Sequence, residues 1–398
     1  MNAKKTALRP CPICDRNRAE ILFAMRCAVL EGGVSDVVSC IDCGMVYADT
    51  PGTQADYDRL YTDFSIYESQ DALGSGDEPE DARRIEETAG WLEARIGARN
   101  ARIVDIGCAR GGLLKALSRR GFSSLAGIDP SARCVEHVRA AGFSAWQGHL
   151  SHLPGCGQDF DFIILSHVLE HVVDTHGALS GLRELLAPGG KLYIEVPDAS
   201  RYHHHQETRP PFGFFYPEHI NHFDLPHLTR LCALHGLGVS DVCRKPVIPA
   251  FGILVSPHFP CALGEEEENH LKNIIAAYHL ESQRRSSSRI EFLLDQIGGR
   301  PVALWGVGEQ AFRMLADPAW KKVDIVAVVD RDPAMQGKIY ADCIIRSPEE
   351  GLRRLPGNTL VVILPFFHAE EIKRELTRLH TGLSSLVLNP PSMEQNLT

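Results

Sequence analysis

Short apolar runs alternate with amphipathic segments through the middle of the chain, and this alternation predicts an α/β fold. Apolar runs of about four to eight residues are typical of buried parallel strands, and a period near 3.6 is typical of the helices that cover them. The predicted strands are 103–106, the stretch that ends at Asp129, 143–147, 160–166 and 191–197. The predicted helices are 81–96, 113–120, 132–141 and 179–186.

The pattern changes after residue 200. Residues 201–223 form a long aromatic and histidine-rich stretch, and loops of this length in a compact domain are usually functional. A helix is predicted over 226–235. Two further strands, 236–243 and 252–256, are predicted to form an antiparallel hairpin that ends the sheet. A long helix is then predicted to link this region, up to residue 297, to a second α/β unit of about 100 residues.

Two pairs of cysteines near the N-terminus have the spacing of zinc knuckles. Cys11 and Cys14 form one CxxC pair, and Cys40 and Cys43 form the other. Two such turns complete a tetrahedral zinc site, which predicts a small zinc-binding module. A CxxC redox centre is the alternative, although two knuckles in one short segment favour metal. Four cysteines leave no open coordination position, so the predicted zinc is structural.

Composition and charge restrict the partners. The formal net charge is −10, and a nucleic-acid-binding protein would need a basic face. No apolar run reaches the length of about 18 residues that a transmembrane helix requires, and residues 1–8 lack the apolar core of a signal peptide. We therefore expect a cytoplasmic protein that binds a small-molecule substrate, and neither nucleic acid nor a membrane. Its oligomeric state is not predicted.

A glycine-rich turn joins the predicted strand 103–106 to the helix that follows. Gly107 and Gly111 lie in this turn, and Asp129 ends the next strand. Such a turn at the carboxyl edge of a parallel sheet is a ligand site, and Asp129 is placed to bind the two hydroxyls of a ribose. An ordinary strand–helix turn without a ligand is the alternative.

The residues of this turn distinguish between nucleoside cofactors. Ala109 stands where a dinucleotide fingerprint has its second glycine. Asp105, at the end of the strand, would repel a pyrophosphate but suits a cationic amine. The pattern D-x-G-x-A-x-G with a later acidic strand end resembles the first two motifs of class I S-adenosylmethionine-dependent methyltransferases.

A second motif strengthens the resemblance. The string HVLEH at 167–171 is similar to the fourth-strand segment of many class I methyltransferases. The family places its first histidine beside the cofactor and its second toward the substrate. For His171, a structural role at a helix start stays open. The resemblance assigns the following residues to S-adenosylmethionine: Asp105, Gly107, Cys108, Gly111, Asp129, His149, Leu150, Ser166 and His167.

The stretch after residue 200 supplies a candidate catalytic group. Tyr216, Glu218 and His219 offer a phenol, a carboxylate and an imidazole within four residues. An imidazole can accept a proton near neutral pH, and a neighbouring carboxylate increases its basicity. The alternative is that His219 and Asn221 cap and pack the following helix.

The order of these blocks resembles the sugar C-methyltransferases, which act on nucleotide-linked 4-keto-deoxy sugars. The resemblance implies His219 as the base that removes the proton beside the ketone, with Glu218 supporting it. It implies that Tyr216, His171 and Tyr67 hold the keto-sugar and stabilise the enolate. For Tyr67, packing within a connecting segment stays an equal alternative.

The resemblance also defines the expected architecture. It predicts an α/β protein with a class I methyltransferase Rossmann-like sheet, an N-terminal zinc-binding module and a C-terminal Rossmann-like domain. The expected segments are a zinc module at 1–70, a methyltransferase core at 71–262, a linking helix at 263–297 and the C-terminal domain at 298–398.

Two other functions stay open from the sequence. The first is an O- or N-methyltransferase acting on a glycan precursor or another small molecule. The second is an NAD-binding enzyme, because Gly306, Gly308 and Ala311 match a G-x-G-x-x-A fingerprint and Asp330 supplies the later acid.

Overall fold

A computed structural model describes the following residues: 4–26, 34–64, 75–76, 79–150, 153, 155, 157, 159–205, 210–245, 249–261, 270–315, 317–333, 335–365, 368–379 and 382–387. Contacts divide the chain into two units. The first comprises Met1–His203 and Pro217–Ala276, and the second comprises His204–Tyr216 and Ala277–Thr398. Among the described residues, no helix is long and apolar enough to cross a membrane.

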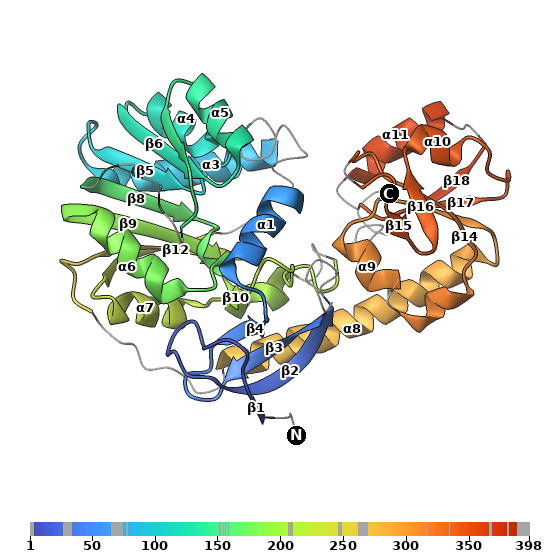
Figure 1. The fold of residues 1–398 in the computed structure, drawn as a ribbon, viewed down its shortest axis with the longest axis horizontal. Helices are drawn as coiled ribbons and strands as arrows, with labels where there is room; N and C mark the ends of the chain where they lie inside the picture. Colours follow the sequence, from blue (N-terminus) through green and yellow to red (C-terminus); the bar gives the residue numbers. More distant parts are fainter. Residues whose placement is uncertain are drawn as a thin grey trace. The chain divides into compact units, whose positions relative to one another are not determined.

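A seven-stranded sheet in the order β11-β12-β9-β8-β5-β6-β7 forms the centre of the first unit (Figure 1). Its strands are β5 (Arg102–Ile106), β6 (Ser124–Asp129), β7 (Ser144–Gln147), β8 (Phe160–Ser166), β9 (Leu186–Pro197), β11 (Gly238–Arg244) and β12 (Ala250–Ser256). Strands β7, β6, β5, β8 and β9 are parallel to one another. Strand β12 is antiparallel to β9 and β11, which confirms the predicted terminal hairpin.

Helices cover both faces of this sheet (Figure 1). The helices of the first unit are α1 (Gln54–Phe64), α3 (Pro79–Ile96), α4 (Gly112–Arg119), α5 (Ala132–Ala140), α6 (Thr175–Leu185) and α7 (Leu225–Leu234). Ile103 and Phe162 pack in one core with residues of α3, α4 and α5. Val104 and Ile163 pack in the other core with residues of α6 and α7. Successive strand residues face opposite sides, so burial of both faces explains the continuous apolar runs.

Two boundaries differ from the prediction. Helix α6 begins at Thr175, before the predicted start at residue 179, because the side chain of Asp174 accepts a hydrogen bond from Gly177 N and caps the helix. Strand β9 begins at Leu186 rather than 191, and Leu186 pairs with Phe160 across a register shift. The sequence analysis missed the starts of α6 and β9 because the residues there are polar or typical of turns.

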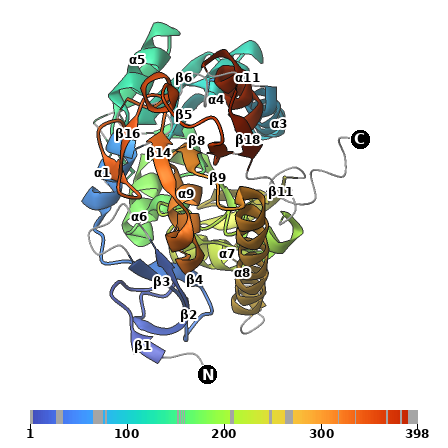
Figure 2. The ribbon, with the colours of Figure 1, turned by 90° about the vertical axis from the view of Figure 1, so that its right-hand side faces the viewer.

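The N-terminal residues form a separate sheet within the first unit. Its strand order is β1-β2-β3-β4-β10, with β1 (Lys4–Thr6), β2 (Arg18–Arg26), β3 (Val34–Cys40), β4 (Val46–Asp49) and β10 (Asn221–His222). Figure 2 shows β2, β3 and β4 side by side. Strand β10 pairs with β4, Asn221 opposite Tyr47 and His222 opposite Val46. The segment that follows His219 is therefore part of the N-terminal sheet.

The second unit contains the other α/β sheet, in the order β15-β16-β14-β13-β17-β18. Its strands are β13 (Val302–Trp305), β14 (Ile325–Val329), β15 (Ile339–Tyr340), β16 (Cys343–Arg346), β17 (Leu360–Ile363) and β18 (Ser384–Val387). Its helices are α9 (Glu309–Leu315), α10 (Pro348–Leu352) and α11 (Ala369–Leu379), and α8 (His270–Ile297) begins in the first unit and continues into the second. The antiparallel pair β15–β16 was not predicted.

Candidate functional site

The glycine turn lies between β5 and α4, as predicted. Gly107 and Gly111 adopt φ values of 78° and 75°, and Ala109 adopts a φ of 46°. A Cβ atom on Gly107 would lie 2.4 Å from Cγ2 of Val168, so only glycine fits there. Since Val168 belongs to the HVLEH string, this contact brings that string against the turn. Strands β5 and β8 are also parallel neighbours in the sheet. The turn after β5 and the HVLEH string after β8 therefore begin side by side.

Asp129 fixes the shape of this turn. Its Oδ2 atom accepts a hydrogen bond from Ala109 N at 2.8 Å, and its Oδ1 atom accepts one from Ser131 N at 2.9 Å. A carboxylate oxygen can accept more than one hydrogen bond, so these two contacts are compatible with further hydrogen bonds from ribose hydroxyls. The arrangement is compatible with the predicted role.

Asp105 is a buried acid beside the same turn. Only 4% of the surface of Asp105 is exposed to solvent. Burial, together with the negative charge of Asp129, raises the pKa of Asp105 to about 7. A cationic ligand group beside Asp105 would stabilise its carboxylate form, because the cation offsets the free-energy cost of burying the negative charge.

The other predicted cofactor residues occupy the same edge of the sheet. Cys108 is buried beside Gly127, where a Cβ atom would lie 2.6 Å from its sulfur. His149 follows β7, and its Nδ1 lies 3.3 Å from Oδ1 of Asp58 in α1. The hydrogen bond to Asp58 raises the pKa of His149 against the opposing effect of burial. Leu150 is buried. Asp58 was not predicted from the sequence, since it belongs to a distant surface helix.

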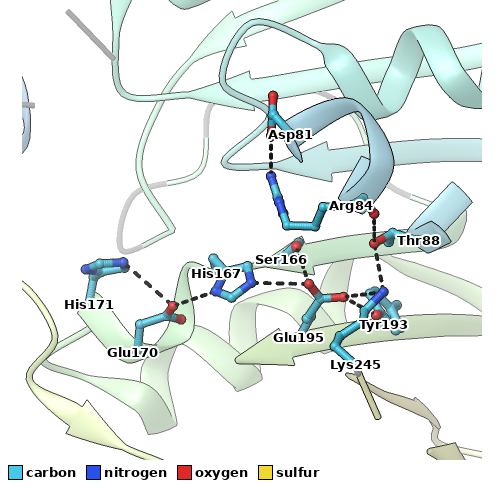
Figure 3. Close-up of polar contacts among 10 residues, drawn as sticks. All are labelled: Asp81, Arg84, Thr88, Ser166, His167, Glu170, His171, Tyr193, Glu195 and Lys245. Carbon is cyan, nitrogen blue, oxygen red and sulfur yellow. Dashed lines mark hydrogen bonds and ion pairs between the residues drawn. The ribbon is translucent and has the colours of Figure 1, made fainter. Parts of the chain in front are cut away.

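A buried polar network runs from β8 to β9 and continues to His171 (Figure 3). Its centre is Glu195, a fully buried acid in β9. Glu195 lies 3.2 Å from Nε2 of His167 and 3.3 Å from Nζ of Lys245, and Ser166 Oγ donates to it at 3.4 Å. Tyr193 also donates to Glu195 through its hydroxyl.

His167 joins two carboxylates in this network. Its Nδ1 lies 3.2 Å from Oε1 of Glu170, and its Nε2 faces Glu195. Burial opposes the charged imidazole, but the two carboxylates outweigh burial and raise the pKa of His167 to about 9. Burial likewise opposes the charge on Glu195, yet His167 and Lys245 lower its pKa well below the usual range.

The network contains residues that the sequence analysis missed. Glu195 and Lys245 were not assigned a role, although both lie in the first unit close to His167. The sequence did contain a signal for Glu195, which is a single acid within the apolar strand 191–197. A charge on a central strand is almost never buried unless it is paired, so this acid could have predicted a buried ion pair. No sequence signal identified Lys245.

His171 and His219 form the part of the site beyond this network. Their ring centroids lie 4.8 Å apart in an edge-to-face arrangement. His171 Nδ1 lies 2.9 Å from the backbone oxygen of Glu218, so it donates there, and His171 Nε2 lies 3.9 Å from Oε1 of Glu170. Glu170, His171 and His219 each offer a ligand atom, and these atoms lie within 4.8 Å of one another.

Two other predicted catalytic residues, Tyr216 and Tyr67, stay predictions. Tyr216 belongs to the second unit, whereas Glu218 and His219 belong to the first. Tyr67 lies outside the described residues. The structure therefore brings together two of the predicted catalytic side chains, His171 and His219, with the backbone of Glu218.

The backbone around His219 is held by buried polar contacts. Asn221 donates to the backbone oxygens of Leu169 at 3.1 Å and Val172 at 2.8 Å. Arg9 Nη2 donates to Ile220 O at 2.9 Å and to Asn221 Oδ1 at 2.6 Å. The alternative that Asn221 caps the next helix is wrong.

The N-cap of α7 is supplied by a different residue. The side chain of Asp224 accepts a hydrogen bond from His227 N at 3.0 Å. The imidazole of His227 donates in turn to the backbone oxygen of Cys43, with 2.8 Å from Nε2. The start of α7 is therefore attached to the second cysteine knuckle.

The four predicted metal-binding cysteines converge. Sγ of Cys11 lies 3.5 Å from that of Cys43, and Sγ of Cys14 lies 3.5 Å from that of Cys40. All four sulfur atoms lie within 4.8 Å of one another. Four thiolates at this separation repel one another unless a cation or protons neutralise them, and four sulfur ligands suit zinc. The cluster could therefore bind zinc.

The turn after β13 has the same backbone features as the turn at Gly107. Gly306 adopts a φ of 97°, and a Cβ atom there would lie 2.3 Å from Cγ of Pro365. Asp330 at the end of β14 accepts a hydrogen bond from Val307 N at 2.7 Å. The second unit thus has the backbone of a nucleotide-binding turn, and the NAD hypothesis stays open.

Comparison with known proteins identifies the class of the segment that contains the Gly107 turn. Residues 81–242 match a family described as a methyltransferase domain. With the turn at Gly107 and the acid at Asp129, they form an S-adenosylmethionine-dependent methyltransferase domain.

Curated relatives match part of this domain. A ubiquinone biosynthesis O-methyltransferase of Pseudomonas aeruginosa is 29% identical over 116 residues, which cover 27% of this chain and 48% of the relative. An enzyme of the same description from Bradyrhizobium sp. is 32% identical over 122 residues, covering 29% of this chain and 46% of the relative. The chain thus spans about half the length of the curated relatives that it matches.

Solved structures also align with the chain. A protein from Pyrococcus horikoshii aligns with 17% identity and a TM-score of 0.40, over 52% of this chain and 100% of that one. A complex of the Haloferax volcanii Trm112 activator with a methyltransferase contains a chain with 18% identity and a TM-score of 0.40, over 48% of this chain and 96% of that chain.

Proposed function

We propose that the protein is a C-methyltransferase that transfers the methyl group of S-adenosylmethionine to the carbon beside the ketone of a nucleotide-linked keto-deoxy sugar. The pairing of His171 with His219, at 4.8 Å between ring centroids, is the observation that carries this proposal. The HVLEH string that bears His171 packs on the glycine turn through Val168. The proposed proton acceptor, His219, therefore contacts a residue of the segment that packs on the expected cofactor turn.

Each residue would have a defined task. His219 would take the proton beside the ketone, and the carbon would form its new bond to the methyl group as the bond from sulfur to methyl breaks. His171 would help to hold the sugar by accepting a hydrogen bond from one of its hydroxyl groups at Nε2, because Nδ1–H donates to the backbone oxygen of Glu218. Glu218 would support His219, and Tyr216 and Tyr67 would hold the substrate. Bound S-adenosylmethionine supplies an activated methyl group, so alignment accounts for most of the remaining barrier.

A second candidate is methyl transfer to an oxygen. The curated relatives are ubiquinone biosynthesis O-methyltransferases, and this similarity favours the second candidate. His219 would then take the proton of a hydroxyl group, with the same geometry. The two candidates differ in whether a carbon-bound proton of the acceptor is lost.

Deuterium exchange separates the candidates. The full chain is incubated in D₂O, without the methyl donor, with a panel of nucleotide-linked 4-keto-deoxy sugars, and wash-in beside the ketone is followed by NMR. We expect exchange that falls at least 100-fold in the His219→Asn variant. Exchange should be unchanged in His258→Asn, a matched control at an exposed histidine that contacts Gly189 N.

Two results would overturn the carbanion reaction. One is the absence of exchange with every sugar, and the other is full activity of the His219→Asn variant. Product mass and NMR analysis with S-adenosylmethionine then identifies an oxygen-methylated product if the second candidate is correct.

Two further parts of the function are proposed with it. Cys11, Cys14, Cys40 and Cys43 bind one structural Zn²⁺, which the convergence of their sulfur atoms supports. The reaction uses S-adenosylmethionine, which the first unit binds, and does not use NAD. Calorimetry with S-adenosylmethionine and with NAD(H) tests this assignment, and tight NAD(H) binding with no affinity for S-adenosylmethionine would reverse it.

A further inference from the structure

Glu170, His171 and His219 form a compact set of metal-binding groups, here called the His–Glu cluster. One ligand atom from each lies within 4.8 Å of the others. Ligands at about 2.0–2.2 Å from a common ion lie about 3–3.5 Å from each other, so a closure of about an ångström would complete the site. Glu170 and His171 come from one short 3₁₀ turn, Leu169–His171, and His219 comes from the segment before β10.

His171 is oriented as metal-bound histidines are. Its Nδ1–H donates to the backbone oxygen of Glu218, so Nε2 is the ring atom that carries the lone pair. A histidine ligand usually donates its other ring N–H to a backbone oxygen or a carboxylate, because this contact fixes the tautomer and the ring orientation. Nε2 is the atom that lies 3.9 Å from Glu170.

Glu170 has a buried carboxylate oxygen that could bind a cation. The residue is 1% exposed, and its Oε1 atom pairs with His167. Within the described part of the chain, its Oε2 atom has no hydrogen-bond partner. A buried carboxylate oxygen without a partner is costly, and a cation would offset that cost.

The donor set selects the class of ion. Two imidazoles and one carboxylate suit zinc and neighbouring transition metals, whereas calcium and magnesium prefer oxygen ligands only. Three protein ligands also leave coordination positions open, unlike the four-cysteine cluster.

We propose that the His–Glu cluster binds a divalent transition-metal ion such as Zn²⁺, at a site separate from the cysteine cluster. The ion takes a ring lone pair of His219, and a histidine bound in this way cannot accept a proton from the substrate. The metal-bound form therefore blocks the base that the proposed function requires. This consequence rests on the proposed function, but the site itself does not.

Metal stoichiometry tests the site without reference to activity. The full chain is equilibrated with Zn²⁺ and then passed through a desalting column, and its zinc content is measured by mass spectrometry. We expect two zinc ions per chain in the wild type and in His258→Asn, and one per chain in Glu170→Gln, His171→Gln and His219→Asn. Three variants are used so that misfolding of one, judged by circular dichroism, leaves the others to decide.

Co²⁺ distinguishes the two sites by spectrum. A cysteine-bound Co²⁺ gives intense sulfur-to-metal charge-transfer bands, whereas nitrogen and oxygen ligands give only weak visible bands. We expect one equivalent to produce charge-transfer bands and a second to add visible bands that disappear in His219→Asn. A single equivalent in the wild type, or two equivalents in all three variants, would overturn the site.

Deuterium exchange in the presence of Zn²⁺ tests the consequence. We expect saturating Zn²⁺ to slow wash-in beside the ketone at least tenfold, and removal of the weaker ion to restore it. Faster exchange with bound Zn²⁺ would overturn the blocking role. Absence of exchange in protein that keeps only the cysteine-bound zinc would instead contradict the proposed function, so the two failures are distinguishable.

Discussion

Ala109 carries backbone strain at the centre of the cofactor turn. Its φ of 46° lies in the left-handed region, which costs a residue with a Cβ atom about 1–2 kcal/mol. Its backbone N–H is held by Asp129, so the turn keeps this conformation. A glycine would adopt the same backbone without that cost, as Gly107 and Gly111 do in the same turn.

Substitution of Ala109 by glycine should stabilise the protein. We expect the free energy of unfolding to rise by about 1 kcal/mol, because the relief of strain exceeds the added entropy of the unfolded chain. Urea denaturation measures the change. Ala116→Gly, in the buried face of α4, is the matched control and should lower the free energy by about 1 kcal/mol. A destabilised Ala109→Gly variant would contradict the strain argument.

Asp105 should make stability depend on pH. Its pKa is about 7 in the folded protein and near 4 when unfolded, so the unfolded chain releases this proton first as pH rises. The contribution of Asp105 to the free energy of unfolding should therefore fall between about pH 4 and 7, by up to about 4 kcal/mol. Asp105→Asn should remove this loss and be more stable than the wild type at pH 8.

Denaturation of both proteins from pH 5 to pH 8 checks this expectation. Asp161→Asn serves as the control, because the hydrogen bond from Arg102 N lowers the pKa of Asp161 and gives its contribution the opposite sign. A constant difference between Asp105→Asn and the wild type across this range would refute the assignment.

At the scale of elements, strand β10 decides where the candidate base lies. It is only a two-residue strand, Asn221–His222, yet it pairs with β4 of the N-terminal sheet and bonds through Asn221 to the turn after β8. Arg9 completes the attachment with its buried guanidinium. His219 therefore depends on three segments that are far apart in the sequence.

Arg9 should act as a positioning residue for His219. In Arg9→Met the backbone oxygen of Ile220 and the amide of Asn221 lose a charged donor, which should lower the free energy of unfolding by about 2–4 kcal/mol. We expect kcat to fall at least tenfold while the KM for S-adenosylmethionine changes little, because the displaced group is the base. Steady-state kinetics and denaturation measure both effects.

The control for Arg9 is an arginine of the same sheet. Arg18→Met removes an exposed ion pair with Asp42, which should leave the free energy of unfolding nearly unchanged because solvent screens the pair. Arg9→Lys should recover part of kcat if the charge at this position matters. An unchanged kcat in a folded Arg9→Met variant would exclude the positioning role.

At the scale of the whole molecule, the cysteine cluster belongs to the same unit as the cofactor turn. His227 of α7 donates to Cys43 O, and Thr175 of α6 donates to Pro12 O at 2.5 Å. Both knuckles are thus joined to helices that cover the methyltransferase sheet. A metal that orders the knuckles would consequently order the segment that carries His219.

Zinc removal should separate catalysis from cofactor binding. After chelation and desalting, we expect methyl transfer to fall at least tenfold, because the sheet that contains β10 loses its support. Binding of S-adenosylmethionine, measured by calorimetry, should fall less, since the Gly107 turn is held by β5, β6 and Asp129. Equal losses of binding and transfer would contradict this separation, and restored activity after addition of one equivalent of Zn²⁺ would support it.

The sequence by itself determined the parts whose signals are local. The apolar strands, the glycines with positive φ, Asp129 and the cysteine pairs all reflect constraints from neighbours within a few residues. These signals were sufficient for the α/β fold, the methyltransferase turn and the four-cysteine cluster.

Only the tertiary structure decided the contacts that depend on pairing between distant segments. Glu195 with His167 and Lys245, β10 with β4, and Glu170 with His171 and His219 are examples. No periodicity encodes such partners, because the free energy of a buried charge or a short strand depends on what the rest of the chain brings to it. The glycine turn was evident from the residues, whereas the surroundings of His219 were fixed by folding.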